Sequence, residues 1–120
     1  MSDDTKAWTI RLTDAAAEDF KSIIRWTIGQ FGEQQARVHT ETLSAALRDL
    51  RFGPTLAGIR VRDDIANGIL TLHLARRGRR ARHFVMFRIA AHQAHVVEVL
   101  RLLHDAMDPP RHLPPLIENE

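Results

Sequence analysis

Residues 13–54, TDAAAEDFKSIIRWTIGQFGEQQARVHTETLSAALRDLRFGP, contain two consecutive helical patterns and decide the fold. In the first half, apolar residues recur at spacings of three and four, which places them on one stripe of an α-helix. The stripe consists of Ala16, Phe20, Ile23, Ile24, Thr27 and Phe31. Thr13 is a favourable N-cap for this helix, because its side-chain oxygen can accept a backbone hydrogen bond from the first turn. Trp26 lies on a flank of the stripe, where it can pack at the edge of the core or anchor an interface with a partner.

The second half repeats this periodicity and ends at a stop signal. Its stripe consists of Ala36, His39 or Thr40, Leu43, Ala46, Leu47 and Leu50. Gly53-Pro54 ends the helix, since Pro cannot continue one. Gly32 lies between the two patterns, where a C′ glycine in a left-handed conformation would close the first helix. The short link predicts two antiparallel helices that form a helical hairpin.

Four strands are predicted around this hairpin. They lie at Trp8–Leu12, Ile69–Ala75, His83–Ile89 and Val96–Leu103. Short links between the last three predict an antiparallel meander, and residues 53–68 are expected to be a connection with turns. The fold class is therefore α+β, with an N-terminal strand and an antiparallel helical hairpin packed on a small, mostly antiparallel sheet in the order β-α-α-β-β-β. We expect the hairpin to cover one face of the sheet and to leave the other face open.

Length and composition exclude several classes of protein. The 120 residues fit one domain at 8–108, with a flexible tail at 1–7 and a Pro-rich tail at 109–120. Because there is no Cys, disulfides, thiolate metal sites and a Cys nucleophile are excluded. The sequence contains no nucleotide-binding glycine motif or metal-ligand spacing, so we expect no cofactor and no metal. It also lacks a membrane-spanning run or a signal peptide, so we expect no membrane partner and a cytoplasmic location.

The small net charge of +2 conceals a basic block. Residues 60–88 carry eight Arg against Asp63 and Asp64, a balance of +6, and both flanking parts of the chain are acidic. Five of these Arg crowd one predicted hairpin, namely Arg76, Arg77, Arg79, Arg80 and Arg82. The loop is either a solvated tip that keeps the sheet soluble or a site for anions, since guanidinium groups suit phosphate and carboxylate.

Candidates for acid–base chemistry lie on the predicted sheet. They are Arg82, His83, Arg88, Arg101 and His104. A His that transfers protons and several Arg that stabilise phosphorane charge could together cleave RNA. Alternatively, Arg88 and Arg101 could form structural ion pairs with Glu98 or Asp105. The spacing by itself favours the structural alternative.

The C-terminal string 99–113, VLRLLHDAMDPPRHL, resembles the signature of the ParE toxins, a branch of the RelE/ParE superfamily of bacterial toxin–antitoxin modules. The family pattern is an apolar strand that ends in Arg-x-Leu-His, followed by Met-Asp and by Arg-His-Leu, and these residues occur here in order. Phe31-Gly32, Gln35-Ala36, Pro54 with Gly58, and Arg82-His83-Phe84 resemble further family positions. The resemblance spans about residues 8–113 and implies the fold already predicted from periodicity.

The resemblance implies a toxin, of the kind linked to plasmid stabilisation, that inhibits growth in the bacterial cytoplasm. It would be neutralised by a cognate ParD-like antitoxin of the ribbon-helix-helix type and would reach operator DNA only through that antitoxin. ParE-like members poison DNA gyrase and have no known hydrolytic activity, whereas RelE members cleave mRNA on the ribosome with basic residues and a Tyr or His. This chain has no Tyr, which favours the gyrase branch, but His104 keeps the nuclease open. A relative that binds antitoxin without toxicity is a third alternative.

Residues are assigned to these roles as follows. We expect target contact from Arg76, Arg77, Arg79, Arg80, Arg111 and His112. We expect antitoxin contact from Trp26, Arg82, Arg88 and Arg101. In the alternative nuclease, the catalytic set would be Arg82, Arg88, Arg101 and His104.

Overall fold

The computed structural model describes residues 7–105, which form one mixed sheet and one bent helix. The elements in chain order are β1 (Thr9–Leu12), α1 (Asp14–Asp49), the 3-10 turn η2 (Leu50–Phe52), β2 (Arg60–Val61), β3 (Leu70–His73), β4 (His83–Ile89) and β5 (Val96–His104). The sheet has the order β1-β5-β4-β3-β2. β1 pairs in parallel with β5, and the other neighbours are antiparallel. The predicted α+β class and the meander are confirmed. The predicted tails, apart from Ala7, lie outside the described residues.

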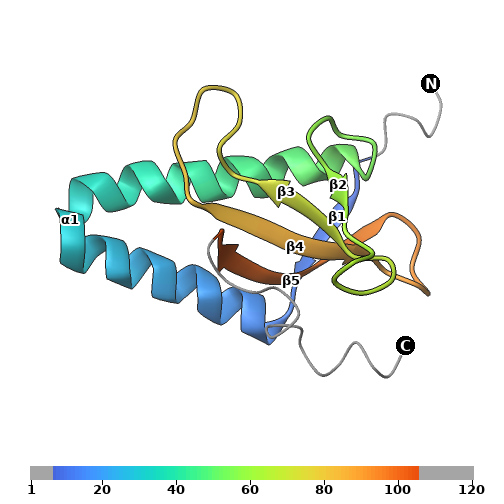
Figure 1. Ribbon diagram of the computed structural model, residues 1–120. Helices are drawn as coiled ribbons and strands as arrows, with labels where there is room; N and C mark the ends of the chain where they lie inside the picture. The colour runs from blue at the N-terminus through green and yellow to red at the C-terminus, as the bar shows by residue number, and fades with distance from the viewer. Residues whose placement is uncertain (1–6, 106–120) are drawn as a thin grey trace.

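The bend in α1 produces the predicted helical hairpin. Gly32 has a φ of 88° and a ψ of 173°, so the backbone leaves the helical conformation at that residue alone. The φ is positive, as predicted for this glycine, but the extended ψ differs from that of a left-handed cap. Figure 1 shows the two arms meeting at one end of the molecule, with the sheet lying across their open ends. Within residues 7–105, no helix combines the length and apolarity needed to cross a bilayer.

The start of α1 is fixed to the sheet by Thr13. Its Oγ1 accepts a hydrogen bond from the Ala16 N–H at 3.1 Å, which confirms the predicted N-cap. The same hydroxyl donates to the Leu100 carbonyl at 2.9 Å, and the Thr13 N–H donates to the Val99 carbonyl at 3.0 Å. Thr13 therefore caps the helix and attaches it to β5 at once.

One apolar core lies between the hairpin and the sheet. Its buried members are Ala16, Leu43, Ala46 and Leu50 from the helical side, and Leu72, Leu74, Val85, Phe87, Val97, Val99 and Leu102 from the sheet. The stripes predicted for both helices face this core, with one exception. Phe31 was expected to be buried, but it is 62% exposed, because it lies at the end of the hairpin, beyond the sheet.

The opposite face of the sheet carries a second buried cluster, so the expectation of an open face was wrong. The cluster consists of Ile69, Phe84, Met86, Leu100 and Leu103. Ile65 and Ala66, from the connection before β3, pack against it. Burial on both faces explains why β4 and β5 are almost continuously apolar instead of alternating.

The connection at residues 53–68 also contains a strand that was not predicted. β2 pairs Arg60 with Thr71 and Val61 with Leu70. Two residues flanked by turn signals carry no readable alternation, so periodicity could not detect this edge strand.

We expect Gly53→Ala to destabilise the fold strongly. Gly53 has a φ of +91°, and an added Cβ would lie 2.5 Å from Trp8 Nε1. Backbone strain and steric overlap together should cost roughly 2–4 kcal/mol in unfolding free energy, measured by urea denaturation. The matched control is Gly29→Ala, where an added Cβ meets nothing within 4 Å on a helix. The control should stabilise by about 0.5–1 kcal/mol. Equal effects of the two substitutions would contradict this account.

Candidate functional site

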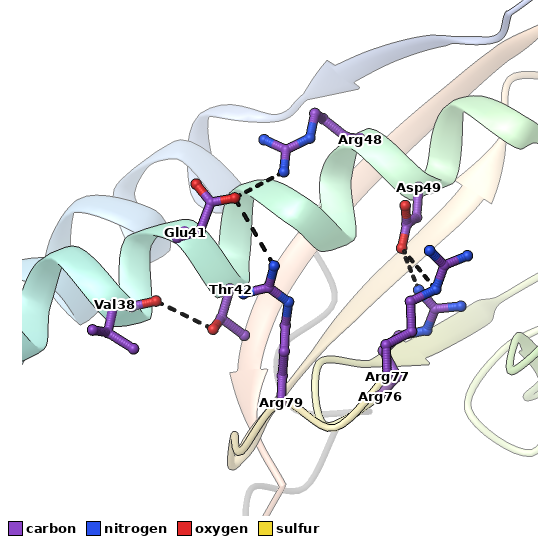
Figure 2. A network of polar contacts seen from close by, with 8 residues as sticks. All are labelled: Val38, Glu41, Thr42, Arg48, Asp49, Arg76, Arg77 and Arg79. Carbon is purple, nitrogen blue, oxygen red and sulfur yellow. Dashed lines mark hydrogen bonds and ion pairs between the residues drawn. The ribbon is translucent and has the colours of Figure 1, made fainter.

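The arginine loop between β3 and β4, residues 76–82, folds back onto the second arm of α1 (Figure 2). Arg76 Nη1 lies 2.5 Å from Asp49 Oδ2, and Arg77 Nε lies 3.9 Å from the same oxygen. Arg76 also donates to the Ala57 carbonyl at 3.1 Å. Arg76 is therefore largely buried and positions the loop, whereas the Arg77 side chain remains exposed.

A second acidic residue of the same arm holds the tip of the loop. Glu41 Oε1 accepts a hydrogen bond from Arg48 at 2.9 Å and lies 4.0 Å from Arg79 (Figure 2). The hydrogen bond and charge of Arg48 lower the pKa of Glu41, so this carboxylate stays ionised. Arg80 is exposed and forms no ion pair within residues 7–105. The loop is thus partly neutralised by its own chain, and Arg77, Arg80 and Arg82 remain as its exposed cations.

At the end of β4 and β5, one carboxylate gathers several basic side chains. Asp105 Oδ2 lies 3.3 Å from His73 Nε2 and 3.4 Å from Arg82 Nε, and Asp105 Oδ1 lies 3.5 Å from His104 Nδ1. Desolvation would raise the pKa of Asp105, but the hydrogen bonds from His73 and Arg82 outweigh it and lower the pKa. The Arg82 side chain is 73% exposed, so it can still contact another molecule.

Next to this carboxylate, three imidazole rings are neighbours in space, in the order His39, His83 and His104. The ring centroids of His39 and His83 are 5.5 Å apart, and those of His83 and His104 are 5.3 Å apart. Burial, followed by the charges of His39 and His104, lowers the pKa of His83 from 6.5 to about 4. Its buried Nδ1 has no hydrogen-bond partner. Within residues 7–105, no group of three or more His, Asp or Glu side chains is arranged to hold a metal ion.

Arg88 is part of an ion-pair network on the face of the sheet away from the hairpin. Its Nη2 lies 2.7 Å from Glu98 Oε1, and Arg11 Nη2 lies 3.1 Å from Glu98 Oε2. Glu98 points to this face because its neighbours Val97 and Val99 belong to the core on the helical side. The predicted Arg88–Glu98 pair is confirmed, and the Arg88 side chain is only 14% exposed.

Arg101 forms a different pair from the one predicted. Its Nε and Nη2 donate to the two carboxylate oxygens of Asp19 at 2.6 and 2.8 Å, and the Leu102 N–H donates to Asp19 at 3.0 Å. The hydrogen bond to Asp19 raises the pKa of Arg101. Pairing with Glu98 or Asp105 was the wrong expectation, because β1 pairs only with Val96–Val99 of β5, and Asp19 of α1 lies beside the next part of that edge, where it accepts hydrogen bonds from Arg101 and from the Leu102 N–H.

The structure does not bring the proposed nuclease set together. Arg88 and Arg101 are each held by a separate carboxylate, Glu98 and Asp19, and among the described residues only Arg82 and His104 of this set share a neighbour, Asp105. The candidate target contacts Arg111 and His112 lie outside the described residues. Sequence reasoning missed five side chains that organise the site, namely Asp19, His39, Glu41, Asp49 and His73. Their partners are far away in the chain, so no local spacing could indicate them.

Trp26 occupies the exposed end of the helical hairpin. It is 58% exposed and meets Phe31 edge-on, with 5.7 Å between the ring centroids. Two large aromatic side chains outside the core are typical of an interface.

The comparisons with known proteins agree with this architecture. Residues 10–109 match the sequence profile described as the ParE toxin of the type II toxin–antitoxin system parDE. The chain belongs to the ParE toxin family. Among solved structures, the fold is similar to a chain of the chromosomal ParDE system from P. aeruginosa, with a TM-score of 0.65, 18% identity, and coverage of 83% of this chain and 98% of that one.

A chain of the RelBE2 toxin–antitoxin complex from Mycobacterium tuberculosis also has a similar fold, with a TM-score of 0.55 and 22% identity. The similarity covers 86% of this chain and 97% of that one. No curated protein sequence matches the chain. This ParE toxin family member therefore has a fold similar to that of both chains.

We expect the low pKa of His83 to make the fold sensitive to acid. The unfolded chain binds a proton at His83 near pH 6.5, and the folded chain binds it only near pH 4. The contribution of neutral His83 to the unfolding free energy is therefore fully present above pH 6.5 and is lost as the pH falls to about 4. Because the ring is partly exposed, we expect a loss of roughly 1–2 kcal/mol, below the value that the full shift implies.

His83→Gln tests this expectation, since it removes the titrating imidazole and leaves the carboxylates and the other imidazoles in place. Urea denaturation of both proteins at pH 7, 5.5 and 4 should show a smaller loss of stability for the variant. Parallel losses in the two proteins would disprove the role of His83.

Proposed function

We propose that this ParE family member is a growth-inhibiting toxin of the bacterial cytoplasm that acts by binding DNA gyrase, and that a cognate antitoxin neutralises it. Membership in a family described as toxins of type II toxin–antitoxin systems supports the toxin role. A ParD-like antitoxin of the ribbon-helix-helix type would supply the operator DNA contact. The resemblance of the C-terminal string to gyrase-poisoning members supports the choice of target.

The state of the arginines supports binding over catalysis. A nuclease needs guanidinium groups that are free to stabilise the charge of a transition state. Here the Arg88 and Arg101 side chains are 14% and 23% exposed, and each is held by a carboxylate of the chain itself, Glu98 and Asp19. This engagement of both guanidinium groups is the observation that carries the non-enzymatic proposal.

The exposed side chains indicate where each partner would bind. The target would contact the exposed Arg77 and Arg80 of the arginine loop, with Arg79 beside them and Arg76 as the residue that positions the loop. Arg111 and His112 stay candidates for the same contact. The antitoxin would contact the exposed Trp26 and Arg82, whereas Arg88 and Arg101 would contribute mainly by shaping the sheet.

One observation favours a second candidate function, an mRNA endonuclease of the RelE type. His83, His104 and Arg82 lie together around Asp105, and paired imidazoles next to a cation can transfer protons during RNA cleavage. The low pKa of His83 weakens this candidate, because such a group is a poor base at neutral pH. A relative that binds antitoxin without toxicity is the remaining alternative.

Induction of the chain in a sensitive bacterial host tests the proposal. Gyrase poisoning should give DNA breaks, an SOS response and filamentation while translation continues. Co-expression of the adjacent open reading frame should restore growth, and the two products should co-purify through 1 M salt.

One double variant separates the proposed target from the nuclease. Arg82→Ala combined with His104→Ala should preserve DNA breakage if the chain poisons gyrase, and should abolish transcript cleavage if it is a nuclease. Rapid arrest of translation with cleaved transcripts would refute the gyrase proposal. The absence of any growth defect would favour the non-toxic relative.

A further inference from the structure

A cavity of about 450 Å³ opens beside β3 where the short strand β2 ends. β2 pairs only with Leu70 and Thr71, so the second half of β3 has no strand on this side. The polar residues that line this β3 cavity are Arg60, Arg62, Thr71, His73, Arg76 and Asp105. Except for Arg76, none of them is among the target or antitoxin contacts considered so far, and the volume lies within the range of ligand-binding pockets.

Cations exceed carboxylates around the β3 cavity. Three guanidinium groups line it, those of Arg60, Arg62 and Arg76, together with one carboxylate, that of Asp105. Arg62 is paired with Asp64 at 2.8 Å, Arg76 with Asp49, and Asp105 with Arg82. The side chain of Arg60 is exposed and forms no ion pair within the described part of the chain. The cavity therefore carries an excess positive charge, with Arg60 as the group free to bind an anion.

The carboxylate of Asp105 at the other end of the cavity already has donors. The Ala75 N–H donates to His73 Nδ1 at 3.0 Å, so the neutral ring carries its proton on Nε2, which points to Asp105 Oδ2 at 3.3 Å. Arg82 contacts the same oxygen. An incoming anion is thus drawn to the end that holds Arg60, Arg62 and Arg76 and is kept away from Asp105.

The lining favours a peptide over a nucleic acid. Leu72, Ala75 and Phe84 contribute apolar surface, which suits an apolar side chain next to an acidic one. Bases of single-stranded nucleic acid stack on exposed aromatic rings. Among the described residues that line the cavity, Phe84 is the one Phe or Trp, and it is buried.

We propose that the β3 cavity receives an acidic segment of the antitoxin, with carboxylates bound by Arg60 and Arg62 and an apolar neighbour placed on the side of Leu72 and Ala75. This inference rests on the proposed function, since it requires a protein partner. It gives the neutralising partner a second contact surface, in addition to the one proposed at Trp26.

The test uses the full-length chain and the product of the adjacent open reading frame as the probe. Arg60→Ala should raise the dissociation constant, measured by isothermal titration calorimetry, about tenfold or more, because a charge-assisted hydrogen bond is lost. The matched control is Lys21→Ala, an exposed cation on the first arm of α1 that pairs with the exposed Glu18 and is in none of the proposed contact surfaces. The control should stay within about twofold of the wild type, because surface charges outside an interface contribute little.

A second measurement locates the bound segment independently of any substitution. Binding of the same probe to the 15N-labelled chain should shift the amide resonances of Gly58, Thr71 and Ala75. Equal affinities for Arg60→Ala and Lys21→Ala, or unshifted resonances at these three amides despite tight binding, would overturn the cavity assignment and leave the toxin–antitoxin proposal intact.

Failure of the wild-type chain to bind the probe would overturn both proposals together. A single-stranded RNA oligonucleotide provides the last arm of the test. If Arg60→Ala weakened the binding of RNA and left the affinity for the probe unchanged, the β3 cavity would be a nucleic-acid site and the inference would be wrong.

Discussion

The carboxylate of Asp19 joins the helical hairpin to the sheet, and the rest of the fold depends on this connection. It accepts both hydrogen bonds of the Arg101 guanidinium and a third from the Leu102 backbone. A partly buried ion pair is costly unless its remaining donors and acceptors are satisfied, and this one meets that condition. The pair lies next to the register shift between β4 and β5.

Local pattern was sufficient to predict the fold where each element is long and periodic. The spacing of Leu43, Ala46 and Leu50 identified a helix face, and Gly32 identified the bend between the arms. Prediction failed where the position of a residue depends on parts of the chain that are distant in sequence, or where an element is very short. Phe31 has the spacing of a core residue but lies beyond the sheet, and β2 is too short to show a period. The second core was missed although the almost continuous apolar runs of β4 and β5 are typical of strands that are buried on both faces.

The site was less accessible to sequence reasoning than the fold, because ion pairs connect residues that are far apart in the chain. Arg76 is one of five arginines in a conspicuous run, yet its neighbour Asp49 is 27 positions away. Likewise, nothing near His83 indicates that His39 lies beside it. Composition located the basic block, but only the folded chain distinguishes the arginines that position the loop from those that are free to bind.

The two edges of the sheet have a consequence for the chain when no partner is bound. β1 and β2 are the edge strands, and they are four and two residues long. Long, flat and uncharged edges act as templates for pairing with other copies and lead to aggregation. Here both edges are short, and each carries an arginine, Arg11 in β1 and Arg60 in β2. The charge of Arg60, which we propose binds an acidic segment, therefore also disfavours pairing of the β2 edge with a strand of another copy.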